Sequence, residues 1–292
     1  MMLACIGASC LALAIIIMIR QAVDDKNSRD TWEQLRDTDA PAGETVSPEP
    51  VPVPTAMPDP SPESAAPPTA TPEPAPVFVN NPYQDSFLSN SDMAAWLQIP
   101  GTNIDYPVMW TPRDENYYLK RGFDGSYNQN GCLILDTDSC LDPLTTNLII
   151  HGHNMKSGVM FGKLTDYESE EFYRTHKEVI LYTEECQRNY EVIAVFRSQV
   201  FKKSQTDVFK FYMFFQADTQ EEFDDFYDNI KEMSLYDTGV TAQFGDNFLT
   251  LSTCAYHVEQ GRFVVVAKEV ENGDRYLPLA GDNEDQENTI AD

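Results

Sequence analysis

The sequence predicts a mostly β domain, built as a barrel or a sandwich, for the residues from Tyr83 onward. Short apolar runs rich in β-branched and aromatic residues recur along this part of the chain, and turn residues separate them. Hydrophobic residues make up 42% of the 292 residues. That share is sufficient for the core of one domain of ordinary size with appendages.

The expected strands follow one another along this domain. A short helix within 91–97 leads into a first strand, which ends near Ile99 at a Pro-Gly turn. Further strands are expected at 104–110, 131–135, 147–151, 179–182 and 190–200. One more apolar run ends at Cys254, and another begins directly after Arg262.

One amphipathic helix is predicted in the long connection before the run that ends at Cys254. Its apolar residues recur at helical spacing and are Phe223, Phe226, Tyr227, Ile230 and Met233. Thr219 and Glu222 have the spacing of a capping box, which marks the start of a helix. We expect this helix to pack over the β domain.

The N-terminal segment is apolar from Met1 to Ile19, with no charged residue before Arg20. As a helix it would be about 30 Å long, enough to span a hydrocarbon core. A cleaved signal peptide is the alternative. However, the run is long for one and lacks a basic start and a small-x-small cleavage site. We therefore expect an uncleaved transmembrane anchor over 1–20.

The remaining segments divide by composition. The stretch 21–82 contains most of the chain's 19 prolines, together with Ala, Thr and Glu, and predicts an extended stalk. The globular domain is expected at 83–270, and 271–292 reads as an acidic disordered tail. The net charge of −27 argues against a nucleic-acid partner, because few cations could neutralise phosphates. Pairing of Cys132 with Cys140 stays open.

Three residue types with complementary chemistry stand at predicted strand ends. Thr250-Leu251-Ser252-Thr253-Cys254 closes one strand, and Arg262 opens the next, Phe263-Val264-Val265-Val266-Ala267. The run Ile149-Ile150 leads into His151-Gly152-His153-Asn154-Met155. A thiolate can attack a carbonyl, an imidazole can move the proton, and a guanidinium stays charged beside a developing oxyanion.

These three blocks resemble the active site of the class B sortases, and the resemblance covers about residues 83–268. It implies a closed sortase-type barrel of about eight strands, an N-terminal helix, and a helix before the cysteine strand. It also implies Cys254, His153 and Arg262 as catalytic residues. The Gly-His-Asn-Met pattern followed by Phe161 and Leu164 selects His153. No metal or other cofactor is expected.

The same resemblance implies a membrane-anchored cysteine transpeptidase of a Gram-positive-type cell, single-pass, with its catalytic domain outside the membrane. It would cleave an LPXTG-like or NPQTN-like sorting signal after its threonine through a thioester on Cys254. A peptidoglycan-precursor or pilin amine would then accept the protein. Ser252, Thr253 and His151 are expected to bind substrate. At the position of His151, class B members often carry tyrosine.

Other functions remain open alongside this one. The chain could be a pilin-polymerising sortase, a hydrolytic cysteine protease, or a non-catalytic binding module displayed on the cell wall. A zinc site is a further alternative, with His151, His153, Cys254 and His257 as its ligands, since H-x-H and C-x-x-H are suitable spacings. Asp136 and Asp138 could orient an imidazole, but residues of this type commonly form turns after strands, so they receive no catalytic role.

Overall fold

The structure, a computed structural model, describes residues 2–39 and 78–277. Its α-helices are α1 (Met2–Asp39), α2 (Gln84–Ser89), α3 (Glu170–Thr175) and α4 (Gln220–Met233). Its strands are β1 (Phe78–Val79), β2 (Met93–Gln98), β3 (Asp105–Met109), β4 (Leu133–Leu135), β5 (Asn147–Gly152), β6 (Glu178–Thr183), β7 (Cys186–Gln199), β8 (Phe248–Cys254) and β9 (Gly261–Tyr276).

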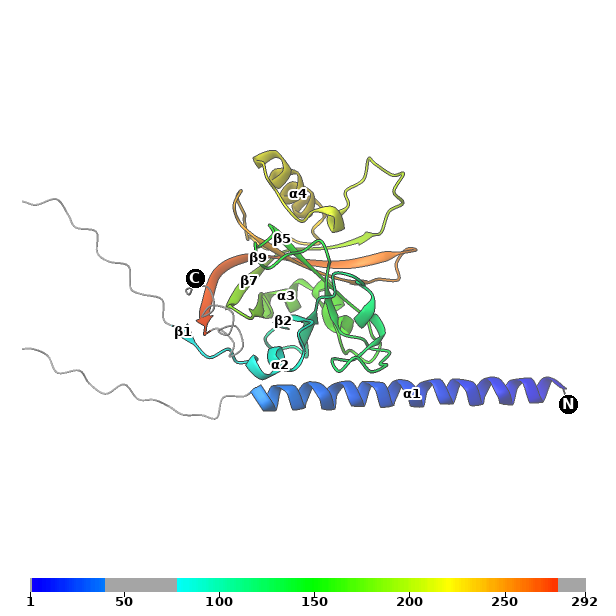
Figure 1. Ribbon diagram of the computed structural model, residues 1–292. Coiled ribbons are helices and arrows are strands. Elements are labelled where there is room, and N and C mark those ends of the chain that lie inside the picture. The colour runs from blue at the N-terminus through cyan, green and yellow to red at the C-terminus, as the bar shows by residue number, and fades with distance from the viewer. Residues whose placement is uncertain (1, 40–77, 278–292) are drawn as a thin grey trace, which may run out of the picture.

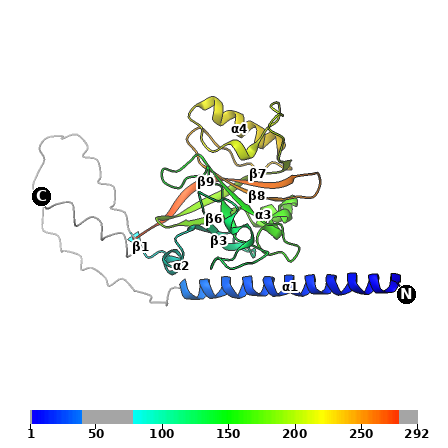
Figure 2. The same ribbon diagram turned by 45° about the vertical axis from the view of Figure 1, so that its right-hand side comes forward.

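The strands form a closed barrel (Figure 2). The sheet runs in the order β1-β9-β7-β6-β2-β3-β4-β5-β8, and a further pairing of β8 with β9 joins its two ends. β1 pairs with β9 alone, in parallel, so the barrel itself consists of the eight strands β2 to β9. The expected closed, mostly β fold is confirmed.

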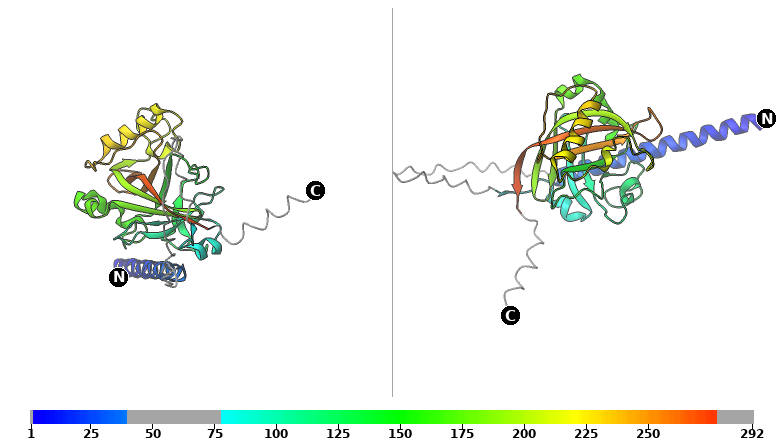
Figure 3. Two further views of the ribbon diagram at one scale, coloured as in Figure 1. Left: turned by 90° about the vertical axis from the view of Figure 1, so that its left-hand side faces the viewer. Right: turned by 90° about the horizontal axis from the view of Figure 1, so that it is seen from above.

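Alternate residues of β8 and β9 serve two separate cores. Leu249, Leu251 and Val265 belong to the large cluster inside the barrel. Phe248 and Val264 point the other way and pack in a second cluster beneath α4, which lies over the outside of the barrel (Figures 1 and 3). This alternation is the normal period of two for a strand buried on both faces.

Helix α4 is the amphipathic helix that the sequence predicts. Its capping box is complete: the hydroxyl of Thr219 accepts from the backbone N–H of Glu222, and the Glu222 carboxylate accepts from that of Thr219. Phe223, Phe226 and Ile230 are buried against the barrel. Both the helix and its position before β8 are therefore confirmed.

The expected short helix within 91–97 is wrong, because β2 occupies most of this segment. β2 pairs with β3 on one side and β6 on the other. Its Trp96 is fully buried, and the indole N–H donates to Asp105 Oδ1 at 2.7 Å. These long-range contacts override the local helix preference of Met93-Ala94-Ala95. A helix does precede the strand, but it is α2.

Helix α1 docks along the barrel through its second half (Figure 1). Trp32 is 1% exposed, and its ring meets that of Tyr106 edge-on at 6.0 Å. The Ser28 hydroxyl accepts from the side-chain amide of Asn128 at 2.9 Å. Arg36 forms an ion pair with Asp105 at 3.4 Å. The stalk expected from residue 21 is thus wrong for 21–39, and residues 40–77 lie outside the described residues.

The membrane span expected over 1–20, on which the expected single-pass membrane localisation depended, is also wrong. In the described parts of the chain, no helix is both long enough and apolar enough to cross a bilayer.

The C-terminal boundary differs from the expected one at 270. β9 continues to Tyr276, which is buried, so the first residues of the expected acidic tail belong to the barrel. Cys186 and Arg188 of β7 pair with this extension. Residues 278–292 lie outside the described residues.

Replacing Trp32 by alanine should lower the free energy of unfolding by on the order of 3 kcal/mol, because the substitution leaves a cavity between α1 and the barrel. Urea unfolding of the full chain measures this. Val23→Ala is the matched control, since Val23 lies on the same helix and is 49% exposed. Equal stability of the two variants would contradict the docking of α1.

Candidate active site

The sequence-predicted Cys254 and Arg262 face each other where β8 ends and β9 begins. They are register partners in the antiparallel pair. The loop between them is closed by hydrogen bonds from Ala255 N to Gly261 O, at 2.9 Å, and from Gly261 N to Val258 O, at 3.1 Å. A Cβ at Gly261 would clash with the carbonyl oxygen of Ala255. Glycine therefore lets the loop return tightly enough to set Arg262 beside Cys254.

Among the described residues, neither Cys254 nor Arg262 forms a disulfide or an ion pair. Cys254 is a free, half-buried thiol. Arg262 donates from Nη1 to the carbonyl oxygens of Gln260, at 3.3 Å, and Gly261, at 3.1 Å. None of the ion pairs in the described part of the chain includes Arg262, so its positive charge is not neutralised there by a carboxylate.

His153 follows the adjacent end of β5. β5 runs parallel to β8 with Gly152 beside Thr253, so the next residue along the chain arrives at the level of Cys254. The Asn154 side-chain amide donates to the Cys254 carbonyl oxygen at 2.8 Å and ties the two strand ends together. The Gly-His-Asn-Met segment and the cysteine block thus meet, as the sequence predicts.

The orientation of the His153 ring is fixed by the Leu119 carbonyl oxygen, 2.8 Å from Nε2. Since a carbonyl oxygen only accepts, Nε2 carries a hydrogen in this contact. In a neutral ring, Nδ1 is then the basic nitrogen that can exchange a proton. The backbone of His153 is held as well, because its carbonyl accepts from Phe161 N at 3.0 Å.

Close packing explains why a glycine precedes His153. A Cβ at Gly152 would lie 2.6 Å from side-chain carbons of both Leu133 and Phe161. Phe161 and Leu164 are fully buried in the barrel core. The spacing from the Gly-His pair to the Phe-x-x-Leu pair therefore reflects a contact between the end of β5 and the segment after it.

The three residues expected to bind substrate differ in their surroundings. His151 is the register partner of Ser252, so both side chains share the outer face with Cys254. Ser252 is 1% exposed, and its hydroxyl has no hydrogen-bond partner among the described residues. Thr253 points into the barrel and donates to the Gly152 carbonyl oxygen at 2.8 Å. It joins β8 to β5, and its expected role in substrate binding stays a prediction.

From the sequence, the partner of His151 was considered as a residue that could orient an imidazole, but it received no role. The Nε2 atom of His151 lies 3.1 Å from Oδ2 of this partner, Asp136, the residue directly after β4. The only signal was the position of Asp136 at a strand end, and turn formation explained that equally well. Asn154 was missed as a separate contributor, although it stands inside the Gly-His-Asn-Met pattern.

Two hypotheses about cysteine are not supported. Cys132 and Cys140 are free thiols that contact the backbone carbonyl oxygens of Arg121 and Asp142, respectively. Among the described residues, the group of side chains positioned to hold a metal ion consists of Glu115, Asp136 and His151. It contains one of the four expected zinc ligands and omits Cys254.

Comparison with known proteins agrees with this geometry. The sortase domain model matches residues 97–270. Sortase B of Listeria monocytogenes is 31% identical over 194 residues, which cover 66% of this chain and 75% of that protein. Sortase B of Staphylococcus aureus is 29% identical over 184 residues, which cover 62% of this chain and 72% of that protein.

Solved structures show the same relationship. Clostridium perfringens sortase B aligns with a TM-score of 0.57 and 28% identity, over 64% of this chain and 99% of that one. The Staphylococcus aureus sortase B–substrate complex aligns with a TM-score of 0.59 and 26% identity, over 66% and 87%. The barrel, the paired cysteine and arginine strands and these matches together show that the chain belongs to the sortase family, as a cysteine transpeptidase of the sortase B type.

Proposed function

We propose that this chain cleaves a C-terminal sorting signal and transfers the protein to an amine, with Cys254 as nucleophile, His153 as acid and base, and Arg262 as oxyanion donor. The observation that carries this proposal is the register pairing of Cys254 with Arg262 at the barrel end where His153 emerges. The Cys254 thiol is free and half-buried, and a positive guanidinium that no carboxylate in the described part of the chain neutralises lies beside it. Such a charge stabilises the thiolate, which is the form of cysteine that attacks a carbonyl.

The first half-reaction forms a thioester. The Cys254 thiolate attacks the carbonyl carbon of the threonine in the sorting signal, and the carbonyl oxygen becomes an oxyanion to which Arg262 donates. The C–N bond then breaks. His153 delivers a proton to the departing amide nitrogen, so the C-terminal fragment leaves as a neutral amine and the threonine stays bound to sulfur.

The second half-reaction resolves the thioester. An incoming amine attacks the same carbonyl carbon, gives up a proton to the neutral imidazole, and expels the Cys254 thiolate. The products are a new amide bond and the enzyme in its starting form. Water in place of the amine would give hydrolysis, and a pilin amine would give polymerisation. Supplying an amine acceptor with a sorting peptide and measuring ligated against hydrolysed product separates these outcomes.

Two relatives indicate the substrate classes. The Staphylococcus aureus enzyme has been solved in complex with a substrate, and a sortase B has been solved in complex with triglycine. For this chain we assign an LPXTG-like or NPQTN-like peptide as donor and a peptidoglycan-type or pilin amine as acceptor. His151 and Ser252 share the outer face with Cys254, which suits them to contact the peptide.

Cys254→Ala should abolish both peptide cleavage and formation of the covalent thioester, because the proposed reaction uses no other nucleophile. Mass spectrometry of the enzyme mixed with a sorting peptide detects the thioester directly. Cys140→Ala is the matched control, since Cys140 is another free, half-buried thiol. If the Cys254→Ala protein cleaves the peptide at the wild-type rate, the assignment of the nucleophile fails.

His153→Ala should lower kcat/KM for transpeptidation by about 10²–10⁴-fold, the usual contribution of a general acid–base group. His151→Ala should cost much less, because the proton transfers run through His153. Steady-state rates of the two variants, measured beside wild type, check this. Comparable losses in both would mean that His151 shares the proton transfer or performs it.

Arg262→Lys should be impaired by about 10²–10³-fold, the typical cost of losing one oxyanion donor. An ammonium keeps the charge but lacks the planar fork that reaches two acceptors at once. Single-turnover acylation rates isolate this step from acceptor binding. A lysine variant that acylates at the wild-type rate would show that charge alone is needed at this position.

A further inference from the structure

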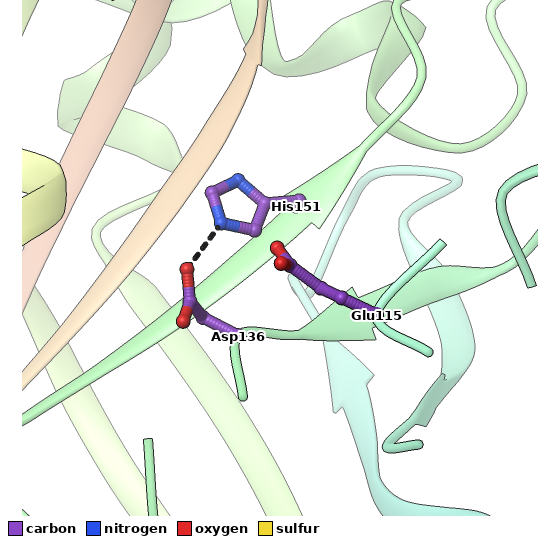
Figure 4. A group of neighbouring side chains, drawn as sticks. All are labelled: Glu115, Asp136 and His151. Atoms are coloured by element: carbon purple, nitrogen blue, oxygen red, sulfur yellow. Dashed lines mark hydrogen bonds and ion pairs between the residues drawn. The ribbon is translucent and has the colours of Figure 1, made fainter. Parts of the chain in front are cut away.

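One imidazole and two carboxylates converge on the outer face of the barrel, and none of them belongs to the proposed catalytic trio. The group consists of Glu115, from the connection after β3, Asp136, from the end of β4, and His151, from β5 (Figure 4). One potential ligand atom from each lies within 4.8 Å of the other two. Three separate segments of the chain thus bring metal-ligating atoms to one point.

The charges in this group are not balanced by protein cations. Among the described residues, no lysine or arginine forms an ion pair with Glu115 or Asp136, and the only charge partner is the His151 ring. Partial desolvation raises the pKa of Glu115, the charges of Asp136 and Asp138 raise it further, and His151 lowers it. A cation placed between the two carboxylates would relieve this repulsion.

A second observation indicates an unfilled polar contact beside His151. Ser252 is the register partner of His151 and shares its face of the sheet. It is 1% exposed, and its hydroxyl makes no hydrogen bond within the described part of the chain. Buried hydroxyls normally have a partner, and a water molecule on a cation held by His151 would supply one.

We propose that Glu115, Asp136 and His151 bind a divalent transition-metal ion of the Zn²⁺ or Mn²⁺ class. Ligand atoms of such an ion, with bonds of about 2.0–2.2 Å, lie roughly 3.0–3.5 Å apart. The 3.1 Å between His151 Nε2 and Asp136 Oδ2 already matches this spacing. Glu115 is exposed, so a rotation of its side chain can bring its carboxylate from within 4.8 Å of the other two ligand atoms to this spacing.

The donor set selects among metals. An imidazole nitrogen favours Zn²⁺ over Mg²⁺ and Ca²⁺, which prefer oxygen ligands alone, and the two carboxylates also suit Mn²⁺. No thiolate belongs to the group, which argues against Cu(I). The ion would lie on the same outer face as Cys254, two residues along β8 from the level of His151. This site does not depend on the proposed function, because its ligands are none of Cys254, His153 and Arg262.

The test is equilibrium dialysis of the full chain with Zn²⁺ and with Mn²⁺, and with Ca²⁺ for comparison. All proteins carry Cys254→Ala, so that zinc on the thiolate is not counted. We expect one equivalent of Zn²⁺ or Mn²⁺ in this background. Glu115→Gln, Asp136→Asn and His151→Gln should each weaken binding by at least about tenfold, since even loss of an outer hydrogen-bond partner of a ligand costs about 10–100-fold.

The controls are Asp138→Asn, a neighbouring carboxylate outside the group, and His257→Gln, an exposed loop histidine. Both should bind the metal as the background protein does. The proposal is overturned if the background protein binds neither Zn²⁺ nor Mn²⁺, or if binding survives both Asp136→Asn and Glu115→Gln. Glu115 is exposed, so its variant keeps the test valid even if a change at Asp136 disturbs folding. Equal binding of Ca²⁺ would overturn the assigned metal class.

Discussion

The pairing of β8 with β9 is the constraint on which the rest of this structure depends. Seven register pairs, from Phe248 with Lys268 to Cys254 with Arg262, join the two ends of the sheet and close the barrel. Closure removes the sheet edges on these two strands, so their backbone groups are paired within the barrel. The same pairing brings a thiol and a guanidinium together, although seven residues separate them in sequence.

The outer face of β8 and β9 carries apolar residues along one part and polar residues toward the proposed active site. On this face, Phe248, Val264 and Val266 lie beneath α4, and Val264 is at the level of Ser252. Toward the proposed active site, the same face carries Ser252, Cys254 and Arg262. Because the strands continue without a break, the rigid packing under α4 also fixes the direction in which the reactive side chains point.

The barrel strands and α4 could be predicted from the sequence because each rests on a local pattern. Alternating or continuous apolar runs mark the strands, and the Thr219–Glu222 capping box marks the start of α4. Other features depend on contacts far apart in the chain. Met93-Ala94-Ala95 has a helical preference by itself, and only its pairing with β3 and β6 makes it a strand.

The structure of the N-terminal segment also depends on contacts that a local sequence pattern does not reveal. Composition alone separated an apolar start from a proline-rich stretch, but Trp32 is revealed as a core residue only by its contact with Tyr106. At the site, the motifs were sufficient to predict that Cys254, His153 and Arg262 meet at one end of the barrel. They could not show that Asp136 reaches His151, because that contact crosses from β4 to β5.

The resting contacts of Arg262 have a consequence for selectivity between ground state and transition state. The guanidinium rests on two neutral backbone carbonyl oxygens, at 3.1 and 3.3 Å. A substrate carbonyl is an acceptor of the same kind and gains little by displacing them. An oxyanion is a charged acceptor, and charge-assisted hydrogen bonds are about twice as strong as neutral ones. In the proposed reaction, the guanidinium would therefore leave these carbonyl oxygens mainly as negative charge develops. Its hydrogen bonds would then stabilise the transition state more than the bound substrate.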